Sequence, residues 1–353
     1  MRRALALALI LAACTQRAPI AKSTVVGDPF AGENGDETPI LRRELESEIL
    51  DSYQRDDRVA ETDWVGVLSS DLGIVRFGVG PDDEQVTTRG APPPRRLPLG
   101  LAVSAGVAPC DRVLRSKKLE LHMAEDGGTA WVSDEVAACA VVCGKIALVP
   151  LRLSAVYVRG ADRWVVAVEH LSYAQPAAAL IARGEQRATP LDAVTAARSW
   201  GPALTALAAT AIEASAPEVR AKVFATTPDA LVWWPDPAHE LRGAAVASGP
   251  SLTDAFDAEK VVVERARIGL GPSLSGAPGT IAWWAGTIAI TARGTAGAVP
   301  IRLRATLVFE RRADRWQVVH AHVSAPIDDA ALAHEIGGDG ARVDHGLVVD
   351  CPK

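Results

Sequence analysis

Two histidines at equivalent places in a repeated segment are the residues of this chain best suited to acid–base chemistry. The segment ADRWVVAVEHLS at residues 161–172 recurs as ADRWQVVHAHVS at residues 313–324, and seven of the twelve positions are identical. The repeat makes His170 and His322 equivalent. A neutral imidazole can exchange a proton near neutral pH or hydrogen-bond a ligand. The alternative interpretation is a pair of core histidines that bond only to their neighbours in the fold.

Strand alternation predicts which side chains accompany the histidines. Successive residues of a strand point to opposite faces, so the charged Arg163 and Glu169 mark the outer face and the tryptophans mark the inner one. The predicted inner-face residues are Trp164, His170 and Ser172 in the first copy and Trp316, His320, His322 and Ser324 in the second. Because His320 stands where the first copy has Val168, we expect a more polar second pocket. Tyr157, on the preceding strand, is the remaining candidate pocket residue.

The strands that precede the histidine strands are also similar. VPLRLSAV at residues 149–156 resembles VPIRLRAT at residues 299–306, which aligns Arg152 with Arg302 at an offset of 150 residues. The histidine strands are offset by 152 residues, so the sequence predicts a two-residue insertion in a turn between paired strands. The alternation places Arg152, Arg302 and Arg304 on the outer face, where we expect solvated or interface charges.

The sequence contains no established catalytic motif. A Ser-His-Asp order, a phosphate-binding loop and an HExxH motif are all missing. Residues 82–84 are acidic but follow Gly80 and Pro81 in a predicted turn, where solvation is expected. We therefore assign no catalytic residue and predict neither a metal site nor a cofactor.

Four cysteines follow the N-terminal region, and they are Cys110, Cys139, Cys143 and Cys351. An even number in an oxidising compartment predicts disulfides, and four cysteines allow three connectivities. Cys139 and Cys143 resemble half of a metal site, but no second pair of Cys or His stands at zinc-ligand spacing. We expect a disulfide among the four, with free buried thiols as the alternative.

The N-terminus is typical of a bacterial lipoprotein. MRRALALALILAA at residues 1–13 has a basic start and an apolar run that is too short to span a bilayer as a helix. It ends in Leu11-Ala12-Ala13-Cys14, which resembles the lipobox in which the cysteine is acylated and becomes the new N-terminus. An ordinary cleaved signal peptide is the alternative. We expect a lipid-anchored protein of the bacterial cell envelope, at the periplasmic face or the cell surface, with Cys14 as the lipidation site.

The charge balance argues against nucleic acid as a partner. The formal net charge is −6, and residues 1–13 contain Arg2 and Arg3 but no acidic residue. Removing them gives −6 − 2 = −8. A chain with this charge lacks the basic surface that binds phosphate backbones.

Two units with the same order of elements follow a polar N-terminal stretch. The first is expected to have a helix over residues 40–54 and strands near 73–79, 116–123, 129–141, 146–158 and 163–172. The second is expected to have helices over 191–214 and 217–224 and strands near 229–234, 260–269, 280–292, 299–311 and 315–324. The predicted segments are a lipoprotein signal peptide at 1–13, a flexible tether at 14–38, a first domain at 39–176, a linker at 177–190, a second domain at 191–327 and a C-terminal tail at 328–353. Helices that precede mostly antiparallel strands predict an α+β fold class.

This pattern resembles the NTF2-like superfamily, and within it the SnoaL-like and calcium/calmodulin-kinase association-domain branch. The final strands of the two units carry the resemblance, and the FGVGPDDE stretch at residues 77–84 is similar to the turn of that branch. The resemblance implies two tandem cones, each a curved antiparallel sheet wrapped around N-terminal helices with a pocket inside. It also implies pairing through the sheets, and hence an intramolecular pseudo-dimer of the two domains.

The sequence favours a cell-envelope lipoprotein that binds a small apolar molecule or a protein partner without catalysis. One alternative is a SnoaL-like isomerase, cyclase or hydrolase that uses His170 or His322 as a general acid or base. Another is a structural or assembly module whose cones are filled by side chains. The membrane is an expected partner through the N-terminal lipid.

Overall fold

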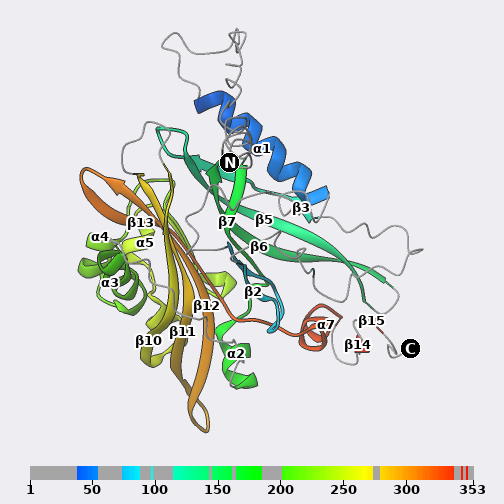
Figure 1. Ribbon diagram of the computed structural model, residues 1–353. Coiled ribbons are helices and arrows are strands. Elements are labelled where there is room, and N and C mark those ends of the chain that lie inside the picture. The colour runs from blue at the N-terminus through cyan, green and yellow to red at the C-terminus, as the bar shows by residue number, and fades with distance from the viewer. Residues whose placement is uncertain are drawn as a thin grey trace, which may run out of the picture.

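The computed structural model describes residues 38–54, 74–87, 97, 114–142, 145–160, 164–184, 201–272, 279–337, 343–344 and 347–348. These residues form a mixed α+β protein with two large curved sheets. The sheets lie face to face in the middle of the molecule, with helices on their outer sides (Figure 1). The predicted signal peptide, Cys14 and the tether before residue 38 lie outside the described residues.

The first unit contains one described helix and seven strands. These are α1 (Thr38–Gln54), β1 (Ile74–Phe77), β2 (Glu84–Thr87), β3 (Leu114–Ser116), β4 (Glu120–Met123), β5 (Thr129–Val142), β6 (Lys145–Arg159) and β7 (Trp164–Ser172). The strand order is β2-β1-β7-β6-β5-β3, and β4 also pairs with β5. The pairs are antiparallel except β1 with β7, which is parallel. Helix α1 covers the outer side at β3 and β4.

The second unit repeats this topology. Its strands are β8 (Leu231–Trp233), β9 (Glu240–Arg242), β10 (Ala258–Leu270), β11 (Ile281–Gly294), β12 (Gly297–Arg312) and β13 (Arg315–Ser324), in the order β10-β11-β12-β13-β8-β9. Its helices are α3 (Gly201–Glu213), α4 (Pro217–Val223), the 3-10 helix η2 (Pro237–His239), α5 (Ala245–Ser248) and α6 (Leu252–Phe256). Strand β8 is parallel to β13, as β1 is to β7.

A constant offset of 152 residues relates the long strands of the two units, so the predicted two-residue insertion between them is wrong. Arg152 pairs with Ser172 in the first sheet, and Arg304 pairs with Ser324 in the second. Arg152 is therefore equivalent to Arg304, and not to Arg302. The error has a physical origin, because a shift of two residues along a strand leaves every side chain on the same face and preserves the apparent match.

Several predicted elements are confirmed, and three segments contain helices that the sequence did not indicate, including residues 237–256 with η2, α5 and α6. Helices α1 and α4 and the long strands occur where they were expected. The expected linker contains helix α2 (Ala177–Arg183), and the expected tail contains α7 (Asp329–Gly337) together with the short strands β14 (Val343–Asp344) and β15 (Leu347–Val348). The first part of the helix predicted at 191–214 lies outside the described residues, and α3 begins at Gly201.

The two units exchange the segments that follow their last strands. The backbone N–H of Gln175, after β7, donates to the carbonyl of Pro235 in the second unit at 2.9 Å. The N–H of Ile327, after β13, donates to the carbonyl of Val79 in the first unit, also at 2.9 Å. Helix α2 packs on β11 and β12, and α7 packs on β5. Each unit is thus held by a segment of the other.

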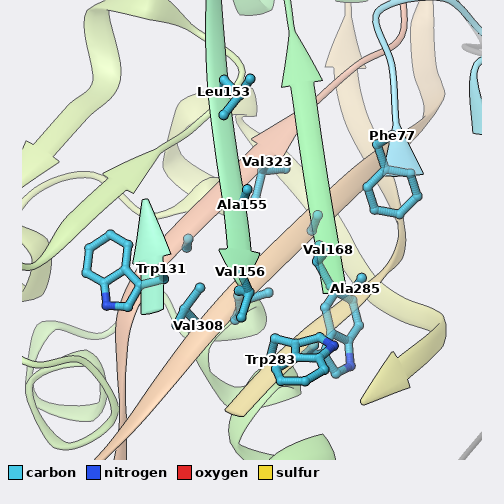
Figure 2. Close-up of a cluster of buried hydrophobic side chains, with 14 of the residues drawn as sticks. Phe77, Trp131, Leu153, Ala155, Val156, Val168, Trp283, Ala285, Val308 and Val323 are labelled. Atoms are coloured by element: carbon cyan, nitrogen blue, oxygen red, sulfur yellow. The ribbon is translucent and has the colours of Figure 1, made fainter. Parts of the chain in front are cut away.

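The core between the sheets contains a cluster of large apolar side chains. Trp131 and Val156 of the first sheet lie close to Trp283 and Val308 of the second, where the strands of the two sheets cross (Figure 2). Burying side chains of this size stabilises a fold by about 1.5–3 kcal/mol each. This apolar packing surrounds the polar groups described next.

Candidate functional site

A β-bulge in each histidine strand divides the predicted pocket residues between two faces. In β7, Tyr157 pairs with Val166 and Val156 pairs with Val168, so Ala167 is an extra residue. The bulge reverses the alternation, because two residues of one strand then oppose one of its partner. Trp164 consequently shares the helix-covered face with Tyr157. His170 lies on the opposite face, toward the second sheet.

The same bulge occurs in β13, where Val308 pairs with His320 and Phe309 pairs with Val318. The prediction of a single inner face was therefore wrong in both copies. The aromatic candidates Tyr157, Trp164 and Trp316 lie on the helix-covered faces, whereas His170, Ser172, His320, His322 and Ser324 point into the space between the sheets. Uninterrupted alternation cannot reveal a bulge, because the extra residue leaves no mark in the hydrophobic pattern.

His170 and His322 meet at the centre of this space. Their rings stack with centroids 3.8 Å apart and an angle of 9° between planes. Nε2 of His170 hydrogen-bonds with Oγ of Ser324 at 2.7 Å, and Nε2 of His322 hydrogen-bonds with Oγ of Ser172 at 2.7 Å. Each imidazole is thus bonded by a hydroxyl of the other unit.

The remaining ring nitrogens are bonded as well. Nδ1 of His170 lies 3.2 Å from Oγ1 of Thr306, and Nδ1 of His322 lies 2.8 Å from Oγ of Ser154. Thr306 and Ser154 are equivalent positions of β12 and β6, since they pair with His322 and His170 in their own sheets. Four hydroxyls and two stacked imidazoles therefore form one nearly symmetric network across the interface.

His320 breaks the symmetry and fixes the direction of the hydrogen bonds in one half. Its Nδ1 lies 3.0 Å from the carbonyl of Leu231, which can only accept, so Nδ1 carries the proton. Its Nε2 must then accept from Ser154 at 2.7 Å. Ser154 has one proton to give, and it therefore accepts from Nδ1–H of His322. The Nε2 of His322 in turn accepts from the hydroxyl of Ser172.

Burial keeps these three imidazoles neutral. His170, His320 and His322 are completely inaccessible to solvent. Burial lowers the pKa of His170 and His322 well below the usual 6.5, and it lowers the pKa of His320 to about 3. An imidazole that solvent cannot reach and whose ring nitrogens are both bonded cannot exchange protons with a substrate. The geometry assigns these histidines to the interface instead of a pocket.

Two arginines flank the network at equivalent positions. Nη1 of Arg152 donates to the carbonyl of Trp234 at 2.8 Å, and Nη1 of Arg304 donates to the carbonyl of Gly78 at 3.0 Å. Each guanidinium also lies over an aromatic ring of the other unit, at 5.5 Å from Trp233 and 5.7 Å from Phe77 respectively. The structure shows the second of the two expected alternatives, an interface charge, for both arginines, because the other sheet covers them.

Arg302, by contrast, lies at the surface. It is partly exposed and pairs with Glu264 on β10 at 3.0 Å. This position matches the solvated charge that the sequence predicted.

A pocket of about 370 Å³ opens at the seam between the units, next to Arg152. Its walls include Lys117, Glu135, Leu151 and Arg152 of the first unit, Tyr173 just after β7, and Glu240 of the second unit. The volume lies in the lower part of the range of small-molecule sites. No pattern in the sequence predicts this pocket, because it exists only where the two units meet.

The helix-covered face of the first sheet holds a buried ion pair. Nε of Arg76 on β1 lies 3.2 Å from Oε1 of Glu169 on β7, and both side chains are buried. Glu169 was expected on a solvated face, and the bulge at residue 167 turns it inward instead. The equivalent positions of the second sheet are the apolar Val232 and Ala321. Local sequence carries no signal for this pair, because β1 and β7 are far apart in the chain.

The same face holds a buried carboxylate. Oη of Tyr53 on α1 donates to Oδ2 of Asp134 at 3.1 Å, and the N–H of Lys118 donates to Oδ1 at 3.0 Å. Burial raises the pKa of Asp134, against the lowering effect of these hydrogen bonds. The equivalent residue of the second sheet is Gly286. At these positions the helix-covered face of the first sheet carries charged side chains, whereas that of the second sheet carries Gly286, Val232 and Ala321.

One cysteine of the predicted set can be placed. Cys139, near the end of β5, is disulfide-bonded, which confirms that the set contains a disulfide. Cys110, Cys143 and Cys351 lie outside the described residues.

The part of the chain that the structure describes contains no group of three or more His, Cys, Asp or Glu side chains arranged to hold a metal ion. None of its helices combines the length and the apolar character needed to cross a bilayer.

Comparisons with known proteins give one family match and several similar solved structures. Residues 202–328 match the family model of the SnoaL-like domain. Similar solved structures include the association domain of C. elegans CaMKII, at 14% identity over 35% of this chain and 91% of that one with a TM-score of 0.26. An NTF2-like superfamily protein from Salmonella enterica has 16% identity over 35% of this chain and 87% of that one, with a TM-score of 0.24.

A third solved structure is an NTF2-like protein of unknown function from Pseudomonas putida. It has 18% identity over 36% of this chain and 87% of that one, with a TM-score of 0.28. Among curated proteins, none matches the chain significantly. The matched span begins in α3 and ends just after β13, so it covers the second unit.

Proposed function

We propose that this chain is a lipid-anchored protein of the bacterial cell envelope in which two NTF2-like units, joined as a pseudo-dimer, bind a small molecule without catalysis. The observation that carries the proposal is the seam pocket of about 370 Å³, which is lined by charged and apolar side chains of both units. The aligned histidines His170 and His322 are poorly placed for catalysis, because they are buried in the interface and both ring nitrogens of each are hydrogen-bonded.

The binding function is tested by identifying what the protein retains. The Cys14→Ser chain is purified under native conditions, denatured, and its released small molecules are identified by mass spectrometry. We expect a stoichiometric compound, or binding of an added compound that raises Tm. A protein that retains nothing and binds nothing from a broad metabolite panel would favour the structural alternative with filled units.

The anchor is tested separately by fractionation. The full chain is expected to sediment with membranes, and Cys14→Ser is expected to release it to the soluble envelope fraction. The matched control is Ser23→Ala, which changes a residue of the same N-terminal stretch and leaves the lipobox cysteine in place. Continued sedimentation of the Cys14→Ser protein would contradict lipid anchoring.

A further inference from the structure

Arg152 is a buried cation with few partners. Its side chain exposes 8% of its surface, and it makes one hydrogen bond, to the carbonyl of Trp234. Among the described residues, no carboxylate oxygen lies within ion-pair distance of its guanidinium. A guanidinium has five N–H donors, and burying this charged group without a counter-charge is costly.

Arg304 shows how the same fold neutralises the equivalent position. It donates to the carbonyls of Gly78, Gly80 and Pro81 at 2.7–3.0 Å, and its Nε lies 3.5 Å from Oε2 of Glu84. The turn that supplies these acceptors fills the space beside Arg304. Arg152 bonds only the equivalent carbonyl, that of Trp234, and it also lines the seam pocket. The two guanidinium groups thus differ in the number of acceptors that the protein supplies.

The charges around the pocket restrict what could pair with Arg152. Its lining contains two cations, Lys117 and Arg152, and two carboxylates, Glu135 and Glu240. Burial lowers the pKa of Arg152, and Glu240, Glu135 and nearby Asp236 oppose that effect from beyond contact distance. Glu240 is already held by Arg242 at 2.8 Å. An anion of high charge would be repelled by these carboxylates, whereas a molecule with both signs of charge would not.

We propose that the seam pocket binds a small zwitterion of amino-acid size, with its carboxylate on Arg152, its ammonium group toward Glu135 and Glu240, and its apolar part on Leu151 and Tyr173. This inference rests on the proposed binding function and gives it a site and a ligand class. Arginine is well suited to the task, because its planar donors match a carboxylate in a bidentate manner. Since both units line the pocket, neither unit alone would form this site.

The test uses the Cys14→Ser chain and the twenty common amino acids as probes. Tm shifts select the tightest binder, and calorimetry then compares it with its analogues that lack the amine or the carboxylate, and with inorganic phosphate. We expect no binding of the analogue that lacks the carboxylate, and no binding of inorganic phosphate. The analogue that lacks the amine should bind roughly tenfold more weakly than the amino acid. Arg152→Met should weaken binding at least tenfold, whereas Arg302→Met, a surface arginine of the other unit, should leave it unchanged.

Folding of each variant is checked by near-UV circular dichroism. If Arg152→Met does not fold, Glu240→Gln replaces it and should weaken binding of the zwitterion but not of the analogue without an amine. Equal affinities in wild type and Arg152→Met would overturn the site. A protein that binds none of the amino acids yet retains another compound would overturn the ligand class and leave the binding function standing. Absence of any ligand would end both proposals.

Discussion

The rings of His170 and His322 stack 3.8 Å apart across the boundary between the two units, and each is bonded by serines or a threonine of the other unit. This arrangement turns two equivalent strand residues into the centre of an interface. Neutral imidazoles suit this role, because each can accept one hydrogen bond and donate another.

Removing one imidazole should strongly destabilise the fold. His322→Ala leaves the hydroxyls of Ser154 and Ser172 without a partner on that side and opens a cavity in the interface. We expect the free energy of unfolding to fall by about 3–5 kcal/mol, measured by urea denaturation at pH 7.5. His334→Ala, at an exposed position of α7, is the matched control and should change it by less than about 0.5 kcal/mol. A loss below about 1 kcal/mol for His322→Ala would contradict the proposed role of the network.

Stability should decrease in mild acid. Because the pKa of each interface histidine is lower in the folded than in the unfolded state, the unfolded state binds more protons below pH 6.5. Stability is then complete above about pH 6.5 and is lost as the pH falls toward 3, by up to about 1.4 kcal/mol per pH unit for each histidine.

The contribution of His320 can be isolated with a substitution that the chain itself supplies. His320→Val copies Val168, its equivalent in the first unit, and removes one of the three titrating groups. The variant should show a shallower decrease of the unfolding free energy between pH 7 and pH 4, whereas His334→Gln should keep the wild-type slope. Parallel curves for wild type and His320→Val would show that His320 is not buried as a neutral group.

The two equivalent arginines should differ in their importance for stability. Arg304→Met removes the donor from three carbonyls and the counter-charge from Glu84, so we expect a loss of about 3–5 kcal/mol. Arg152→Met removes one hydrogen bond and an unpaired cation, and should cost less than about 2 kcal/mol. Both losses are measured by urea denaturation in the absence of ligand. Equal losses would mean that Arg152 is neutralised within the protein.

The ion pair between Arg76 and Glu169 offers a test by double substitution. Glu169→Ala alone leaves a buried cation and should cost about 3–5 kcal/mol. The double variant Arg76→Val with Glu169→Ala copies Val232 and Ala321 of the second unit, and should be more stable than Glu169→Ala alone. The measurement is the midpoint of thermal or urea unfolding. A double variant less stable than the single one would show that the pair does more than neutralise charge.

The sequence by itself determined the duplication, the order of helices and strands, and the kinship of the second unit with SnoaL-like domains. The periodicity of apolar residues was sufficient to predict helices such as α1 and long strands such as β6, because local patterns determine both. Equivalence of His170 and His322 also followed from the repeat alone.

Only the tertiary structure decided where those residues point. A single extra residue, Ala167, moved His170 from the predicted pocket into the interface and turned Glu169 inward. The pairing of Arg76 with Glu169, and the contrast between Arg152 and Arg304, depend on contacts between segments far apart in the chain. Such contacts are fixed by the packing of one sheet on another, and no pattern within a single strand encodes them.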